Sequence, residues 1–267
     1  MMIESFLLDE RYPDCELSAY LSEDSETRRA IVIMPGGGYA RVSSREGEPI
    51  AKYYLSKGFN CFVLRYSVGA RAVDSVPLIE AALAIKHVRE NSDRYRVDPD
   101  RIFVCGFSAG GHLAASSGIL WNDPIVRAAL GNAPEGINKP TGMILSYPVI
   151  TAGELAHKGS IYNLCGTDDP TEEQMNRCSL ERHVDGTTPP TFIWHTFADD
   201  VVPVENSLML AEKLSKHKVP FELHVFPDGE HGLALANEIS CPSPIAPTVS
   251  HAAIWTELSV RWINTFF

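Results

Sequence analysis

Long apolar runs, clustered basic residues and paired cysteine motifs are all missing from this chain of 267 residues. The longest apolar runs, such as residues 31–34 and 102–105, have the length of strands and are far too short to cross a membrane. The scattered lysines and arginines number 23 against 34 aspartates and glutamates, which gives a net charge of −11. Nucleic acid and anionic lipid both attract clustered positive charge, so we expect neither nucleic acid nor a membrane as a partner.

The cysteines show neither CxxC spacing nor matching histidine pairs, and they stand at positions 15, 61, 105, 165, 178 and 241. This spacing speaks against a zinc site, and we expect no metal and no organic cofactor. The first 20 residues lack the basic start and the uninterrupted apolar stretch of a signal peptide. We therefore expect a cytoplasmic protein without a disulfide framework.

Neither a linker nor an internal repeat divides the chain, so we expect one domain over residues 1–267. Short apolar segments alternate with segments of helical periodicity. The predicted strands are 30–34, 60–66, 101–106, 142–147, 191–195 and 221–226, with a turn at 98–100, and the predicted helices are 47–57, 77–91, 109–121, 204–216 and 251–264. This alternation predicts an α/β fold with a mostly parallel, doubly wound sheet that has helices on both faces.

The segment Gly106-Phe107-Ser108-Ala109-Gly110 matches the G-x-S-x-G pattern. It follows the predicted strand 101–106 directly and leads into the helix predicted from residue 109. A sharp turn between a buried strand and a helix lifts a serine hydroxyl out at the end of the strand, as in α/β-hydrolases. We therefore predict that Ser108 is a nucleophile, with an incidental serine in a glycine-rich turn as the alternative.

The glycine run Pro35-Gly36-Gly37-Gly38-Tyr39 follows the predicted strand 30–34. Acyl transfer builds negative charge on a carbonyl oxygen, and preorganised backbone N–H groups stabilise that charge. We predict that Gly37 or Gly38 supplies one such donor and that the N–H of Ala109 supplies the other. The alternative is a flexible loop without a role in chemistry.

His231 is the predicted base, because it lies in a loop just after the strand 221–226. This is the last place in the Ser…Asp…His order of α/β-hydrolases. His195 and His224 lie within strands, and His112 lies one turn into the helix after the nucleophile. Those three positions are more typical of packed, hydrogen-bonded histidines.

The predicted acid follows the strand 191–195, where two carboxylates stand side by side. Such a group holds the imidazole in the correct tautomer and stabilises its cation. We prefer Asp199 because its distance from Pro203 fits the usual pattern of the fold, and Asp200 stays open as the alternative.

These motifs resemble the α/β-hydrolase fold family in its carbohydrate acetylesterase and feruloyl-esterase-like group, the xylan acetylesterase-like branch related to hormone-sensitive-lipase-type esterases. The resembling segments are PGGGY at 35–39, GFSAGGH at 106–112, WHTFADDVVPVENS at 194–207 and FPDGEHGL at 226–233. The chain departs from typical lipases at Pro35, where a histidine usually precedes the glycine run, and at Glu230, where relatives often carry glycine. The resemblance implies attack by Ser108, an acyl-enzyme intermediate and water-driven deacylation assisted by His231.

The segment 151–190 is too long for a simple connection between strands, and we expect it to form a short cap over the active site. Its composition is polar, whereas a lipase lid would present a broad apolar face. This favours a water-soluble substrate such as an acetyl ester on a xylo-oligosaccharide. Tyr39 and Tyr147 are the predicted substrate-binding residues, and Tyr66 and Tyr162 are further aromatic rings that could stack on a sugar.

Three other functions stay open at this point. A general short-chain carboxylesterase and an arylformamidase-like amidase would use the same triad, and an inactive hydrolase would serve as a ligand-binding module. The expected partner is a small-molecule ester, most simply a sugar ester. The sequence leaves the oligomeric state open, with a homodimer among the options.

Overall fold

The computed structural model describes residues 2–73, 75–240 and 247–267, so Cys241 lies outside the described residues. A single sheet with the order β1-β2-β4-β3-β5-β6-β7-β8 runs through this part of the chain. Its strands are β1 (Met2–Leu7), β2 (Glu16–Leu21), β3 (Arg28–Met34), β4 (Asn60–Arg65), β5 (Val97–Phe107), β6 (Gly142–Ser146), β7 (Thr191–Thr196) and β8 (Phe221–Phe226). Neighbouring strands from β4 through to β8 pair in parallel, and β1 and β2 add two antiparallel pairings at one edge.

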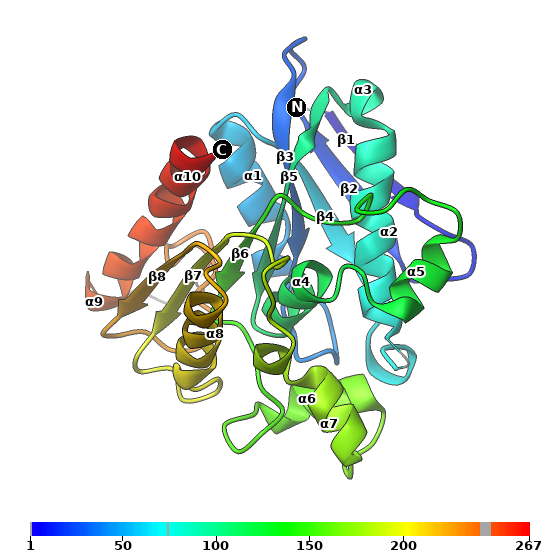
Figure 1. Cartoon of the computed structure of the whole chain (residues 1–267). Coiled ribbons are helices and arrows are strands. Elements are labelled where there is room, and N and C mark those ends of the chain that lie inside the picture. Colours follow the sequence, from blue (N-terminus) through cyan, green and yellow to red (C-terminus); the bar gives the residue numbers. More distant parts are fainter. Residues whose placement is uncertain (1, 74, 241–246) are drawn as a thin grey trace.

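Helices cover both faces of this sheet (Figure 1). The α-helices are α1 (Glu48–Ser56), α2 (Val76–Glu90), α3 (Ser92–Tyr95), α4 (Ala109–Ile119), α5 (Pro124–Leu130), α6 (Lys158–Cys165), α7 (Glu172–Cys178), α8 (Glu205–Lys216), α9 (Pro247–Ser250) and α10 (Trp255–Phe266). Short 3₁₀ turns are η1 (Ser44–Glu46), η2 (Gly69–Arg71), η3 (Leu180–Arg182) and η4 (His251–Ile254). The predicted mostly parallel, doubly wound arrangement is confirmed. No helix in the described ranges combines the length and the apolar character needed to cross a membrane.

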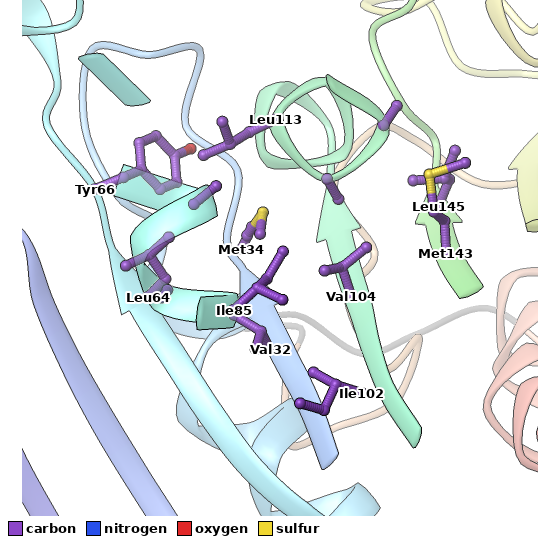
Figure 2. Packing of buried hydrophobic residues seen from close by; sticks show 14 of the residues in the cluster. Val32, Met34, Leu64, Tyr66, Ile85, Ile102, Val104, Leu113, Met143 and Leu145 are labelled. Carbon is purple, nitrogen blue, oxygen red and sulfur yellow. The ribbon is translucent and has the colours of Figure 1, made fainter. Parts of the chain in front are cut away.

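The core lies in two layers because successive residues of a strand point to opposite faces of the sheet. Val32 and Met34 of β3 belong to the layer covered by α2, α4 and α8, and Figure 2 shows them packed with Ile85 of α2 and Leu113 of α4. Ile31 and Ile33 of β3 belong to the layer on the other face, which α1 and α10 cover. Both faces of the central strands are covered, which explains why β3, β5 and β6 read as continuous apolar runs.

The first two strands were not predicted from the sequence. Strand β1 is an edge strand whose side chains are exposed or half-buried, so it carries little apolar signal. Strand β2 does alternate, since Leu17, Ala19 and Leu21 are buried while Glu16 and Ser18 are half-buried. This alternation over a short segment was the available signal.

The turn predicted at residues 98–100 is wrong, because β5 continues through it. The pairing of β3 with β5 shifts register there: Arg28 pairs with Val97, and Ala30 pairs with Ile102. The aspartate chemistry that suggested a turn is present, since Asp98 Oδ1 accepts a hydrogen bond from the N–H of Asp100 at 3.0 Å. It produces a bulge in the strand instead of ending it.

The segment 151–190 contains α6, α7 and η3. Figure 1 places α6 and α7, in yellow-green, together beyond the end of the sheet where α4 begins. A small apolar cluster anchors this segment and includes Val149, Ile161, Cys178 and Val202. Val202 lies in the loop between β7 and α8. The segment is therefore fixed at the carboxyl ends of the strands, where the predicted site lies.

Candidate active site

The serine predicted as nucleophile occupies a one-residue turn between β5 and α4. Ser108 has φ 54° and ψ −120°, a conformation that is strained for a residue with a side chain. The turn fits because the residues two positions before and after Ser108 are glycines: a Cβ on Gly106 would lie 2.2 Å from the Gly110 carbonyl oxygen, and one on Gly110 would lie 2.1 Å from the Met34 carbonyl oxygen. The G-x-S-x-G pattern therefore has a steric basis here.

Three side chains from distant parts of the chain form one line of hydrogen bonds. The Ser108 hydroxyl lies 2.8 Å from His231 Nε2, and His231 Nδ1 lies 2.6 Å from Asp199 Oδ2. In the tautomer that satisfies both contacts, Ser108 Oγ–H donates to Nε2 and Nδ1–H donates to the carboxylate. Asp200 is exposed and lies outside this line. The structure therefore brings together the preferred set of sequence-predicted residues.

Asp199 is buried and well supplied with donors. Its Oδ1 accepts the N–H groups of Val201 and Val202 at 3.0 and 2.9 Å. Burial by itself raises the pKa of Asp199, but hydrogen bonds from His195 and His231 outweigh this cost and hold the pKa well below its usual value. The carboxylate therefore stays ionised at neutral pH, as a group that stabilises an imidazolium must.

His195 lies directly behind this carboxylate and is completely buried. Its Nε2 donates to the Val202 carbonyl at 2.9 Å and lies 3.4 Å from Asp199 Oδ2, while Nδ1 contacts Ser207 Oγ at 2.8 Å. Both ring nitrogens are thus used, as expected for a packed strand histidine. His195 supports the acid and does not reach the serine.

The glycine run after β3 lies against the serine turn. A Cβ on Gly36 would lie 2.9 Å from Ser108 Cβ, and Gly37 and Gly38 adopt φ values of 128° and 66° that favour glycine. Among the described residues, the N–H groups of Gly37, Gly38 and Ala109 donate to no protein acceptor. The backbone therefore keeps three unused donors in the two segments that meet at Ser108.

The prediction that Tyr39 and Tyr147 stack on a sugar needs correction. Their exposed fractions are 1% and 2%, so neither ring has the open face that stacking on a sugar requires. The Tyr39 hydroxyl contacts His112 Nδ1 at 2.9 Å, and the Tyr147 ring packs 5.1 Å from the His231 ring. Tyr39 therefore packs against His112, and Tyr147 packs against the predicted base. Tyr66 is equally buried, and of the four aromatic candidates Tyr162 alone keeps partial exposure.

His112 also supports the glycine run. Burial lowers the pKa of His112 to about 4, so its ring is neutral at pH 7. The ring Nε2–H donates to the Cys178 carbonyl at 2.9 Å, which leaves Nδ1 to accept the Tyr39 hydroxyl. A cavity of about 320 Å³ lies on this side, and its lining includes Tyr39 and His112 but not Ser108.

Three residues from the segment 151–190 reach the glycine run and were not singled out from the sequence, namely His157, Ser160 and Asn163. Asn163 Nδ2 donates to the Gly38 carbonyl at 2.8 Å, and a Cβ on Gly38 would lie 4.0 Å from the ring of His157. Burial and the nearby His231 both lower the pKa of His157. The unusual length of the segment 151–190 predicts a cap over the site. It does not predict which of its side chains face the site.

The site offers no arrangement suited to a metal ion. Within residues 2–73, 75–240 and 247–267, no three His, Cys, Asp or Glu side chains converge as metal ligands would. The polar groups that do converge are a hydroxyl, an imidazole, a carboxylate and backbone N–H donors. Such a set is suited to nucleophilic attack on a carbonyl carbon.

Solved structures resemble this chain over almost its whole length. An acetyl ester-xyloside bifunctional hydrolase from Caldicellulosiruptor lactoaceticus is 38% identical, with a TM-score of 0.82 over 94% of this chain and 88% of that one. A carboxylesterase from Lactobacillus plantarum is 29% identical, with a TM-score of 0.81 over 99% of this chain and 97% of that one.

Curated relatives are longer than this chain. Endo-1,4-beta-xylanase B from Butyrivibrio fibrisolvens is 40% identical over 228 residues, which are 83% of this chain and 35% of that protein. An acetylxylan esterase from Xylanibacter ruminicola is 28% identical over 219 residues, which are 78% of this chain and 42% of that protein. The chain thus spans well under half the length of either relative.

The BD-FAE family model matches residues 17–214, a range that begins in β2 and ends in α8. This range includes the glycine run, the serine turn and Asp199, while His231 lies beyond it. Together with the sheet order and the relatives, the match shows that the chain belongs to the BD-FAE family and has the α/β-hydrolase fold.

Proposed function

We propose that this protein is a serine esterase that hydrolyses short-chain acyl esters, with acetyl esters of carbohydrate as the main substrates. The observation that carries the proposal is the line of hydrogen bonds from Ser108 through His231 to Asp199. Solved relatives named as a carboxylesterase and an acetyl ester-xyloside hydrolase support the same reaction class.

In the first half of the reaction, Ser108 Oγ attacks the carbonyl carbon of the ester while His231 Nε2 takes the hydroxyl proton. The carbonyl oxygen becomes an oxyanion, and the Asp199 carboxylate stabilises the imidazolium that forms. When the tetrahedral species collapses, the bond to the alcohol oxygen breaks and His231 gives its proton to that oxygen. The acyl group stays on Ser108.

In the second half, water takes the place of the departed alcohol. His231 Nε2 accepts a proton from the water as its oxygen attacks the acyl carbon. The bond to Ser108 Oγ then breaks, the proton returns to the serine oxygen, and the carboxylic acid leaves. The enzyme ends in its starting protonation state, so one water is consumed for each ester.

The unused N–H groups of Gly37, Gly38 and Ala109 support the assignment of the oxyanion hole. Gly37 and Gly38 follow Gly36, which packs against Ser108, and Ala109 follows Ser108 directly, so all three N–H groups are candidates to meet a developing negative charge. Removal of one such donor from an acyl-transfer site typically costs about 3 kcal/mol of transition-state stabilisation. Glycines at two of these positions also permit close approach of the substrate.

A carbohydrate ester is supported by what surrounds the glycine run. The segment 151–190 contributes His157 and Asn163 there, and its composition is polar, unlike that of a lid that binds lipid. One relative is named as an acetyl ester-xyloside hydrolase and another as an acetylxylan esterase. We therefore propose that the segment acts as a cap that receives the hydroxyl-rich alcohol part of the ester.

A general short-chain carboxylesterase is the second candidate. The similarity to the Lactobacillus plantarum carboxylesterase extends over 99% of the chain, and the triad chemistry would be identical. The two functions differ only in whether the protein recognises the sugar.

Two acetyl esters with similar leaving groups separate these candidates: mono-acetylated methyl xyloside and ethyl acetate. Recognition of the sugar predicts a kcat/KM at least about tenfold higher for the xyloside, equivalent to ~1.4 kcal/mol of differential transition-state binding. Equal values would favour the general carboxylesterase, and turnover of N-formylkynurenine in place of either ester would favour the amidase. Ser108→Ala should abolish all turnover, and retained activity would overturn the nucleophile assignment.

A further inference from the structure

Glu46 is a buried carboxylate that neither the triad nor the oxyanion hole accounts for. It ends the 3₁₀ turn η1, and only 3% of its surface is exposed. Its Oε2 accepts the N–H of Gly36 at 2.8 Å, and its Oε1 accepts the hydroxyl of Tyr147 at 2.8 Å. Each oxygen of the carboxylate is therefore committed to one fixed partner.

The hydrogen bonds continue through Tyr147 to the loop that carries His231. The N–H of Ala234 donates to the Tyr147 hydroxyl oxygen at 2.9 Å. A phenol has one hydrogen, and with this oxygen already accepting, that hydrogen must point to Glu46. Burial, with Glu46 close by, raises the pKa of Tyr147 far above its usual value, so the phenol keeps its proton as a donor.

One end of this chain of hydrogen bonds lies at the glycine run, and the other end lies in the loop that carries His231. Gly36 lies against Ser108 and immediately precedes the unused donors of Gly37 and Gly38. Ala234 follows His231 by three residues and has an unfavourable φ of 51° for a residue with a side chain. The bond from its N–H to Tyr147 helps to hold that strained backbone in place.

Arg45, the neighbour of Glu46 in η1, also contacts the loop that carries His231. Its Nη1 donates to the Ser240 carbonyl at 3.2 Å, and a Cβ on Gly232 would lie 3.6 Å from its Nη2. The turn η1 thus contacts the glycine run through Glu46. It contacts the loop of His231 through Arg45 and, by way of Tyr147, through Glu46.

We propose that Glu46 is a positioning residue that fixes the separation between the oxyanion donors and His231. The inference rests on the proposed function, because the two loops must converge on one carbonyl group only if Ser108 forms an acyl-enzyme. A shift of about 1 Å in such a constellation is enough to reduce the rate about 100-fold. Glu46 itself does not touch the reacting atoms.

The substitution Glu46→Gln keeps the shape of the side chain and breaks the link whichever way the amide points. With its oxygen toward Gly36, the amide donates to the Tyr147 hydroxyl, which Ala234 also donates to, so the phenolic hydrogen loses its acceptor. With the amide reversed, two donors face each other at Gly36. Either arrangement leaves a buried polar group unpaired.

Glu80→Gln is the matched control, since Glu80 is also a fully buried glutamate and accepts hydrogen bonds from Ser67 rather than from the catalytic loops. We expect Glu46→Gln to lower kcat for p-nitrophenyl acetate at least about tenfold with KM changed less than about twofold. Labelling by a fluorophosphonate should slow by a similar factor. Hydrogen exchange should rise in the peptides that contain Gly36 and Ala234, and Glu80→Gln should change none of these.

Tyr147→Phe provides a second variant should Glu46→Gln fail to fold. It leaves the bond from Glu46 to Gly36 intact, so exchange should rise at Ala234 but not at Gly36, and kcat should fall. In the double variant Glu46→Gln/Tyr147→Phe, the loss of kcat should be smaller than the sum of the two single losses in free energy, because both substitutions interrupt the same chain of hydrogen bonds.

The inference is overturned if Glu46→Gln matches Glu80→Gln in kcat, or if exchange at Ala234 does not change. It is also overturned if Tyr147→Phe retains full kcat. Failure of the proposed function looks different, because Ser108→Ala would then match the wild-type protein in ester turnover.

Discussion

Two adjacent carboxylates follow β7, and only Asp199 contacts the imidazole of His231. Its Oδ1 is held by the backbone N–H groups of Val201 and Val202, and its Oδ2 faces the histidine. Asp200 points into solvent. The same substitution to asparagine can therefore be made at Asp199 and at Asp200, and the two variants can be compared.

Asp199→Asn should lower kcat by about 10³- to 10⁴-fold, because an amide can donate to His231 Nδ1 and so favours the wrong tautomer. Asp200→Asn should change kcat less than about twofold, because it removes only a solvated charge. Steady-state kinetics on p-nitrophenyl acetate at pH 7 measures both. Comparable losses in the two variants would show that Asp199 is not the acid.

His157 lies beside the glycine run, and we propose that it contacts the alcohol part of the substrate. Its Nδ1 accepts from the N–H and the hydroxyl of Ser160, at 3.3 and 2.8 Å, so the ring hydrogen lies on Nε2. Because the pKa of His157 is lowered, mainly by burial, the ring is neutral at pH 7 and presents a single N–H donor.

If His157 meets a sugar hydroxyl, His157→Ala should raise KM for acetylated methyl xyloside about tenfold and leave ethyl acetate unchanged, since the loss is that of one hydrogen bond. His217→Ala, at the exposed end of α8, is the control for loss of a histidine. An equal loss on both esters would mean that His157 supports the glycine run and does not recognise the sugar.

The nucleophile and the base could be predicted because each depends on a local pattern that follows a strand. Ser108 is defined by a steric requirement within five residues, and His231 by its place after the last strand. The roles of Tyr39 and Tyr147 could not be predicted, because burial of an aromatic ring depends on segments far away in the chain. Glu46 was missed for the same reason, since its partners Gly36 and Tyr147 come together only in the folded protein.

At the scale of elements, the junction of β3, β5 and α4 fixes the geometry of the site. The first turn of α4 packs so closely on the end of β3 that Gly110 has no room for a side chain: a Cβ there would lie 2.1 and 2.4 Å from the carbonyl oxygens of Met34 and Pro35. Backbone atoms cannot move aside as a flexible side chain can. The helix and the strand would have to separate.

Gly110→Ala should therefore destabilise the protein by about 3 kcal/mol, the upper part of the range for overpacking, and displace the Ser108 hydroxyl. Gly186→Ala is the control, because a Cβ at that position meets nothing within 4 Å. Urea unfolding gives the free energies, and fluorophosphonate labelling reports the position of the hydroxyl. Equal stability of the two variants would refute the close packing at Gly110.

The buried parallel strands could be predicted from their continuous apolar runs, and the helices between them from their periodicity. Strand β1 could not, because an exposed edge strand needs few apolar residues. The sequence of residues 98–100 predicts a turn where the structure has a bulge, because an aspartate hydrogen bond of this kind occurs in both. The local hydrogen bond accounts for the bend. The strand continues beyond it because β5 pairs with β3 on both sides of the bulge.

At the scale of the whole molecule, one buried carboxyl away from the site links stability to pH. Glu80 of α2 accepts hydrogen bonds from the N–H and the hydroxyl of Ser67, at 2.7 and 2.5 Å, in the loop after β4. Burial raises the pKa of Glu80 to about 7 despite these bonds. The folded state therefore binds a proton more tightly than the unfolded state.

Because this pKa is raised in the folded state, the contribution of Glu80 to stability falls as the pH rises from about 4.5 to about 7. The difference amounts to at most about 3 kcal/mol. Glu80→Gln resembles the protonated form, so its stability relative to the wild-type protein should increase between pH 5 and pH 8. Urea unfolding of both proteins at the two pH values measures this difference. A constant difference would mean that Glu80 titrates at its ordinary pKa.

The central claim is that Ser108 is the nucleophile and that His231 activates it. Mass spectrometry after reaction with a fluorophosphonate tests it most directly. The account predicts one adduct per chain, located on the peptide that contains Ser108, with a rate that falls at least about 100-fold in His231→Ala. An adduct on another residue, or full esterase activity in the labelled protein, would contradict the account.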